Sequence, residues 1–162
     1  MVIELKDIAD SDIPIINRWL ALEHVMRRWG NVTFEDLPAQ GLGNAVIVCD
    51  GLPVGYIQWQ HPSRSKLDTA GLYDIPTNIV DIDIFIGEIS MLRHGIGHCA
   101  VRCLIERINH QFNAPVVFMA CAAIDNLAFI GMFEKAGFKQ DRVFDDAPDG
   151  GLHVILLYRS KI

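Results

Sequence analysis

The sequence predicts an α/β domain with a mixed sheet, and three observations support this prediction. Short apolar runs of strand length alternate with stretches whose apolar residues recur at helical spacing. The β-prone run 82–86 is joined to a helical pattern by a turn that holds Gly95 and Gly97. Hydrophobic residues make up 51% of the 162 residues and charged residues 21%, as in globular chains with a sizeable core. We expect one domain over residues 1–162.

The N-terminal part is predicted to form one strand followed by helices. Residues 2–7 alternate apolar and polar side chains, which indicates a first strand. Ser11 is expected to cap the helix that follows, and Pro14 is tolerated in its first turn. A continuous or broken helix is expected to reach Gly30, and a short helix is expected over 33–37.

The middle of the chain is predicted to contain a hairpin and a long loop. The apolar runs 44–50 and 54–60 are separated by Gly51-Leu52-Pro53, an arrangement typical of a hairpin. Residues 61–78 show no sustained periodicity, so we expect a long surface loop with at most a short strand or helical turn. Loops of more than ~12–15 residues in compact domains are often functional.

The second half is predicted to alternate strands and helices and to close with two strands. Its expected elements are strand 79–89, helix 95–111, strand 115–121, helix 126–136 and strands 138–145 and 152–159. The continuous apolar character of the first of these strands indicates a central position with both faces covered. Asp125 is expected to cap the second helix, and Gly137 to end it.

The charge balance argues against a nucleic-acid partner and is compatible with a cationic small molecule. The net charge is −6 without a basic cluster, whereas sequence-independent nucleic-acid binding requires a patch of Lys and Arg. No apolar run approaches the ~20 residues that cross a bilayer, and the N-terminus lacks a signal-peptide pattern. We therefore expect a cytoplasmic protein with no membrane partner, present as a monomer or homodimer.

The cysteines predict buried thiols rather than disulfides or a metal site. Cys49, Cys99, Cys103 and Cys121 lie in apolar surroundings, and no two of them form a CxxC pair. Cys99 and Cys103 are four residues apart on a predicted helix, but the histidines supply no matching pattern. We expect no metal ion.

The run Leu92-Arg93-His94-Gly95-Ile96-Gly97 is the strongest candidate for a ligand site. Glycines let a backbone approach a ligand closely, and the first turn of a helix presents unpaired N–H groups. Such a turn binds phosphate, although an isolated pair of glycines is more often a plain strand–helix turn. Asn126 and Gly137-Phe138 further along the chain favour the phosphate interpretation.

Taken together, these motifs resemble the GNAT superfamily of acyl-CoA-dependent N-acyltransferases, and within it the aminoglycoside 6′-N-acetyltransferase group. The resemblance covers essentially the whole chain. Besides the glycine turn, it rests on Trp19-Leu20, Arg28-Trp29-Gly30, Pro53-Val54-Gly55-Tyr56, Ile82-Asp83, Asn126-Leu127, Glu134-Lys135-Ala136-Gly137-Phe138 and Pro148-Asp149-Gly150. It implies a mostly antiparallel central sheet flanked by helices on both faces.

The resemblance also implies a reaction. Acetyl-CoA would be the co-substrate, and its acetyl group would pass directly to a primary amine of a cationic small molecule such as an aminoglycoside, at the 6′ position. Two alternatives remain open at this stage. The acceptor could be a polyamine, a peptide N-terminus or a hydroxylamine in siderophore synthesis, or the domain could bind acyl-CoA without catalysis.

The resemblance assigns candidate residues to each part of this reaction. For the cofactor they are the backbone of Ile84, Phe85 and Ile86, the turn Arg93, His94, Gly95, Ile96, Gly97 and His98, and Asn126. Asn126 could instead cap the neighbouring backbone. Asp83 is the candidate general base or amine anchor, with Asp81 two residues away as the alternative. Trp29, Asp68 and Asp149 are candidate acceptor-binding residues, each of which could instead be structural.

The chain departs from the family pattern at several positions. Leu92 stands where Gln or Arg is usual, and Arg93 where Gly is common. Phe133 replaces a Tyr whose hydroxyl is thought to protonate the leaving thiolate, and Cys121 stands where an acidic residue could help to hold an aminoglycoside. Three alternatives remain open. Solvent or another group protonates the thiolate, the thiolate leaves unprotonated, or the domain no longer catalyses.

Overall fold

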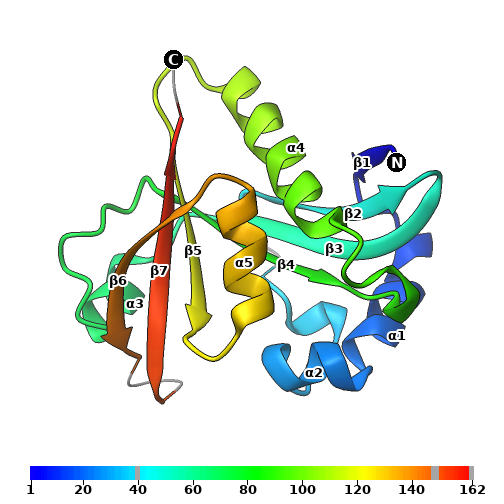
Figure 1. Ribbon diagram of the computed structural model, residues 1–162, viewed down its shortest axis with the longest axis horizontal. Coiled ribbons are helices and arrows are strands. Elements are labelled where there is room, and N and C mark those ends of the chain that lie inside the picture. Colours follow the sequence, from blue (N-terminus) through cyan, green and yellow to red (C-terminus); the bar gives the residue numbers. More distant parts are fainter. Residues whose placement is uncertain (39–40, 147–149, 161–162) are drawn as a thin grey trace. The chain divides into compact units, whose positions relative to one another are not determined.

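A computed structural model describes residues 1–38, 41–146 and 150–160 of the chain (Figure 1). Its strands are β1 (Ile3–Lys6), β2 (Gly43–Cys49), β3 (Leu52–Gln60), β4 (Val80–Ile86), β5 (Val117–Ala123), β6 (Lys139–Asp145) and β7 (Leu152–Arg159). Its helices are α1 (Ile13–Leu20), α2 (Glu23–Trp29), α3 (Arg64–Thr69), α4 (Ile96–Gln111) and α5 (Leu127–Lys135). Short 3-10 turns lie at Asp10–Asp12, Phe34–Asp36 and Ile89–Met91.

The strands form a seven-stranded sheet in the order β1-β2-β3-β4-β5-β7-β6. The pairs β1–β2, β2–β3, β5–β7 and β6–β7 are antiparallel, and β4–β5 is parallel. The predicted mixed, mostly antiparallel sheet with β4 in its centre is therefore confirmed. The described residues form two compact units, one of residues 1–59 and 83–104 and the other of residues 60–82 and 105–162.

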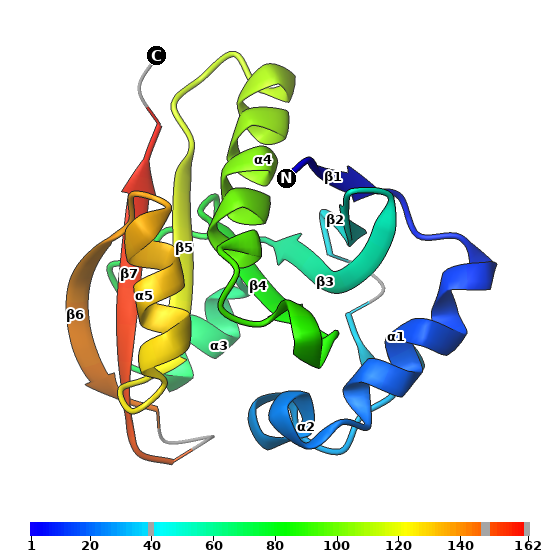
Figure 2. The ribbon, with the colours of Figure 1, turned by 45° about the vertical axis from the view of Figure 1, so that its right-hand side comes forward.

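The first unit is built around a cluster of buried side chains from α1, α2, β2, β3 and β4 and from the residue after the 3-10 turn Phe34–Asp36. The cluster consists of Ile16, Trp19, Leu20, Val25, Leu37, Val46, Val48, Tyr56 and Phe85. Figure 2 shows α1 and α2 next to each other, and the cluster packs both helices onto one face of these strands. Trp19 is fully buried, and its ring meets Phe85 edge-on with centroids 6.2 Å apart. This packing ties the two N-terminal helices to the strand that carries the candidate base.

In the second unit, the strands β5, β7 and β6 are covered on both faces. On one face α5 contacts all three strands, and Figure 2 shows it in front of β5 and β7. On the other face Leu67, Leu72, Ile75 and Ile79 pack with Met119 and Ile155. Leu67, Leu72 and Ile75 belong to the segment 61–78 that was predicted as a long surface loop, so that prediction was wrong in part. The segment forms α3 and contributes its own apolar cluster to the core.

Two predicted helix caps were also wrong. Ser11 lies inside a 3-10 turn, and α1 begins two residues later at Ile13. Asp12 tightens that turn instead, because its Oδ2 accepts hydrogen bonds from Ala9 N–H at 2.8 Å and Lys6 Nζ at 2.7 Å. At α5 the cap is Asn126 and not Asp125, since the Asn126 Oδ1 accepts the Phe129 N–H at 3.3 Å.

Two glycines in regular elements should respond in opposite ways to alanine. A Cβ on Gly55 of β3 would collide with the backbone carbonyl of Phe85. We therefore expect Gly55→Ala to destabilise the fold by about 1–3 kcal/mol. Gly131 lies in α5 with nothing within 4 Å of its Cβ position, so Gly131→Ala should stabilise the fold by about 0.5–1 kcal/mol. Urea unfolding of both variants checks this pair, and an unchanged midpoint for Gly55→Ala would contradict the close approach.

Candidate active site

Asp83 presents an exposed carboxyl from the middle of β4. Its Oδ1 accepts the backbone N–H of Ile84 at 3.0 Å. Protein packed around the carboxyl removes part of its hydration and raises its pKa from 3.8 to about 7, while the Ile84 hydrogen bond acts in the opposite direction. Asp81 is only partly exposed, so Asp83 is the better placed of the two to meet a substrate.

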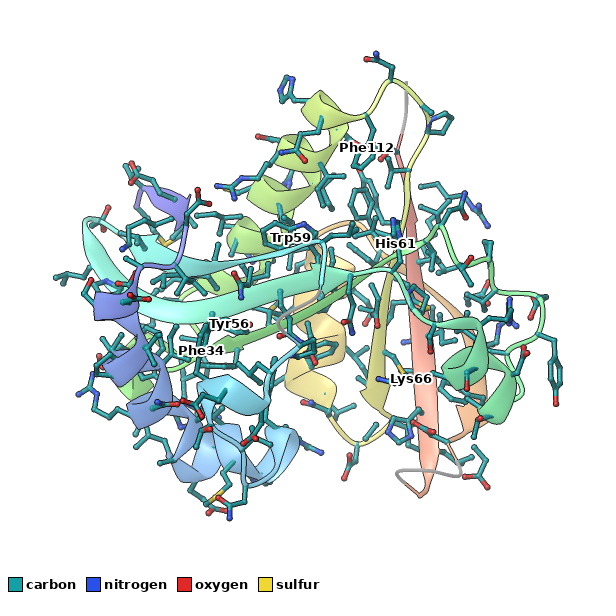
Figure 3. The ribbon with its side chains drawn as sticks, turned by 180° about the vertical axis from the view of Figure 1, so that it is seen from behind. Phe34, Tyr56, Trp59, His61, Lys66 and Phe112 are labelled. Carbon is teal, nitrogen blue, oxygen red and sulfur yellow. The ribbon has the colours of Figure 1, made fainter. Side chains whose placement is uncertain are left out.

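Three aromatic rings pack together on the same unit. Trp29 at the end of α2 meets Phe85 edge-on with ring centroids 5.2 Å apart, and it meets Tyr56 at 6.1 Å. Tyr56 in turn stacks on Phe85 at 5.5 Å. Figure 3 shows Tyr56 close to Phe34, which also packs against this cluster. Trp29 is therefore a core anchor at the helix end, and it keeps a partly exposed face.

A buried polar network lies beside these rings. The Tyr56 hydroxyl donates to Gln58 Oε1 at 2.9 Å, and it also hydrogen-bonds Asn44. Burial raises the pKa of Tyr56 to about 12, and the charge of Asp83 contributes to the rise. Tyr56 is therefore a neutral hydroxyl at physiological pH. The sequence analysis assigned no functional role to Tyr56, Gln58 or Asn44. The alternation of Tyr56 and Gln58 with apolar residues in β3 could have indicated polar side chains on one face of the strand.

The glycine turn leads into α4 through two residues in the left-handed region. Arg93 has φ +66° and Gly95 has φ +77°, and the helix begins at Ile96. Non-glycine residues rarely adopt such a φ. Arg93 adopts it at the position where the pattern described above commonly has Gly. A Cβ on Gly95 would meet the His98 ring at 3.1 Å. This backbone, the first N–H groups of α4 and the exposed Arg93 and His94 suit a pyrophosphate group.

A sequence model of the family described as "Acetyltransferase (GNAT) domain" matches residues 8–146. The chain belongs to the GNAT acetyltransferase family. Among its curated relatives is the aminoglycoside N(6′)-acetyltransferase type 1 of Klebsiella pneumoniae. The two are 26% identical over 163 residues, which cover 91% of this chain and 79% of the relative. A relative of the same name in Serratia marcescens matches equally.

Solved structures show the same fold. The crystal structure of aminoglycoside acetyltransferase AAC(6′)-Ib with coenzyme A and kanamycin superimposes with a TM-score of 0.79 at 21% identity, covering 97% of this chain and 94% of that one. Its complex with ribostamycin and coenzyme A gives a TM-score of 0.78 at 21% identity, covering 97% and 93%. This GNAT acetyltransferase thus shares its architecture with enzymes that bind coenzyme A.

Asn126, Asp68 and Phe133 of this GNAT acetyltransferase lie in the second unit. Asn126 caps α5, which is the structural alternative to a cofactor contact. Asp68 lies on α3 and pairs with Arg64, Nε to Oδ1 at 2.9 Å. Asp149 lies outside the described residues. Phe133 is fully buried, with its ring 4.6 Å from that of Phe129 and 4.9 Å from that of Phe138.

The expected absences concern metal ions, disulfides and membrane spans. Within residues 1–38, 41–146 and 150–160, no three His, Cys, Asp or Glu side chains gather as a metal site would require. All four cysteines fall in these ranges and are thiols; Cys49 is buried as predicted, but Cys99, Cys103 and Cys121 are partly exposed. No helix in the described part of the GNAT acetyltransferase has the length and apolar character needed to cross a bilayer.

Proposed function

We propose that this GNAT acetyltransferase moves the acetyl group of acetyl-CoA directly to a primary amine of a cationic small molecule, namely the 6′-amine of an aminoglycoside. The observation that supports this most is Asp83, an exposed carboxyl of raised pKa on β4. The curated relatives, which are named aminoglycoside N(6′)-acetyltransferases, support the choice of acceptor.

Direct transfer makes three demands, and the proposal assigns groups to each. An amine must lose a proton as it attacks the thioester carbonyl, and Asp83 takes that proton directly or through water. The carbonyl oxygen needs a hydrogen-bond donor as it gains charge. The Ile84 N–H already donates to Asp83, so the N–H groups of Phe85 and Ile86 are the proposed donors, with Ile84 lining the acyl group beside them. The leaving thiolate has a pKa of ~8–9, so it can leave without a proton from the chain. Phe133 therefore does not prevent the reaction.

The turn from Arg93 to His98 would hold the pyrophosphate of acetyl-CoA. Its left-handed residues, Arg93 and Gly95, turn the backbone just before α4, and the first N–H groups of a helix have no partner within the helix. Asn126 is proposed for the pantetheine arm, in addition to its capping bond. The acceptor would be bound by Trp29 through its exposed face, and by the carboxylates of Asp68 and Asp149.

The raised pKa of Asp83 predicts a characteristic pH dependence. Above a pKa of about 7 the carboxylate is free to accept a proton, so kcat/KM should fall as the pH drops below about 7. An ordinary aspartate would keep its activity down to about pH 4. Because the amine substrate titrates as well, the profile should be measured with two acceptors whose amine pKa values differ. The fall in kcat/KM that is due to Asp83 should occur at the same pH with both acceptors.

The same shift predicts how stability changes with pH. The folded state holds the Asp83 proton more tightly than the unfolded chain, so it binds more protons between about pH 4 and 7. Stability should therefore fall as the pH rises through this window. Asp83→Asn removes the titration, and its thermal midpoint should change less between pH 5 and 8 than that of the wild type. Equal changes in the two proteins would contradict the raised pKa.

A panel of acceptors tests the proposed function. Purified protein and acetyl-CoA are mixed with kanamycin, a polyamine, a short peptide or a hydroxylamine, and the release of CoA thiol is followed. Turnover with kanamycin alone supports the proposal. Turnover with another amine alone would replace the acceptor but keep the reaction. Binding of acetyl-CoA without turnover of any acceptor would contradict the proposal.

A further inference from the structure

The end of β4 is held by contacts that the proposed reaction has not yet used. The N–H groups of Gly87 and Glu88 both donate to the Val54 carbonyl of β3, at 2.8 and 3.1 Å. The carbonyl of Ile86 is bound from α2, where the Nε2 of His24 lies 2.9 Å from the oxygen. A carbonyl oxygen only accepts hydrogen bonds, so His24 Nε2 must carry the proton.

These contacts clamp one peptide group at both ends. The Ile86 carbonyl and the Gly87 N–H belong to the same planar unit, so their two partners fix its rotation. The side chain of Glu88 adds a third tie, because its Oε1 accepts from Trp19 Nε1 at 2.9 Å. The strand end is thus attached to β3, α1 and α2, all within the first unit.

We propose that His24 is a positioning residue for acetyl transfer. The Gly87 N–H of the clamped peptide is already bound to Val54. In an extended strand the N–H and the carbonyl of one residue point to the same edge, so His24 Nε2–H, by holding the Ile86 carbonyl, also sets the direction of the Ile86 N–H, which would donate to the acetyl carbonyl. This inference rests on the proposed function, because it assumes that Ile84, Phe85 and Ile86 line the acyl group. Hydrogen-bond donors accelerate a reaction only when they are aimed at the charge that develops, so a rotated peptide group loses part of its effect.

The test compares two substitutions of His24. Leucine has a similar volume but no donor, whereas the side-chain amide of glutamine can donate to the same carbonyl. We expect His24→Leu to lower kcat about tenfold or more with little change in the KM of the amine. His24→Gln should restore most of the lost rate. Ile155→Val serves as the destabilised control, since it should cost about 0.5–1.5 kcal/mol in the second unit without changing kcat.

A second readout needs no acceptor. In His24→Leu, hydrogen–deuterium exchange at residues 84–88 should become faster, and in His24→Gln it should return toward the wild-type rate. If the wild type acetylates no amine, the proposed function fails, and this exchange still decides whether the clamp exists. An unchanged kcat in His24→Leu, or unchanged exchange at 84–88, would overturn the inference.

A measurement on the wild type covers the case in which the leucine variant does not fold. The ring nitrogens of His24 give separate ¹⁵N signals, which report the tautomer. The clamp requires the proton on Nε2, protected from exchange by the Ile86 carbonyl. A neutral ring with its proton on Nδ1 alone would overturn the inference.

Discussion

Asp83→Asn is expected to lower kcat for amine acetylation by about 100-fold or more, because an amide cannot accept the proton of the attacking amine. The variant should stay folded. An asparagine Oδ1 can still accept the Ile84 N–H that Asp83 accepts at 3.0 Å. It also avoids the cost of holding a charge that has lost part of its hydration, so its stability above pH 7 should not fall. Steady-state release of CoA thiol measures the loss.

Asp81→Asn is the matched comparison, because it makes the same change two residues away on β4. It should keep most of the rate, with any loss of stability measured separately by thermal unfolding. A large loss in Asp81→Asn together with normal turnover in Asp83→Asn would move the role of base to Asp81. Normal turnover in both variants would show that neither carboxylate takes the proton.

The second large effect is expected at Gly95. Its φ of +77° strains any branched side chain, and a Cβ at this position would press on the His98 ring at 3.1 Å. In Gly95→Val the turn must change shape, and the N–H groups at the start of α4 lose their alignment. Hydrogen bonds to charged groups contribute about 1.5–3 kcal/mol each. The loss of one such bond should raise the Kd of coenzyme A about tenfold or more.

Gly71→Val controls for the strain itself. Gly71 has φ +76°, almost the value of Gly95, but nothing lies within 4 Å of its Cβ position. The two variants should therefore lose similar stability from the left-handed backbone, while calorimetric titration shows weaker coenzyme A binding in Gly95→Val only. Equal affinity in the two variants would refute the assignment of this turn to the pyrophosphate.

Periodicity predicted most of the sheet and its long helices, but it failed where the core is irregular. Leu67, Leu72 and Ile75 are buried, yet they are five and three residues apart, and only Leu67 lies in a helix. The helix α3 among them has only six residues, which is too short for a helical repeat to show. The cap of α5 was misplaced by one residue because Asp and Asn are equally good caps.

The candidate site divides in the same way. The positions of Asp83 on β4 and of the glycine turn before α4 could be predicted because both lie in short sequence motifs. The raised pKa of Asp83 could not, since it depends on protein that surrounds the carboxyl only after folding. His24 and Ile86 are separated by 62 residues in sequence, so no local sequence pattern predicts their hydrogen bond. Tyr56 and Gln58 are adjacent on one strand face, but only the fold shows that they form a buried pair.

One measurement tests the central claim of acetyl transfer to a 6′-amine most directly. The wild-type protein is given acetyl-CoA with kanamycin, or with an aminoglycoside that has a hydroxyl in place of the 6′-amine. Mass spectrometry and NMR then locate any acetyl group. The account predicts acetylation of the 6′-nitrogen of kanamycin and none of the hydroxyl analogue. Equal turnover of both, or acetylation elsewhere on kanamycin, would contradict it.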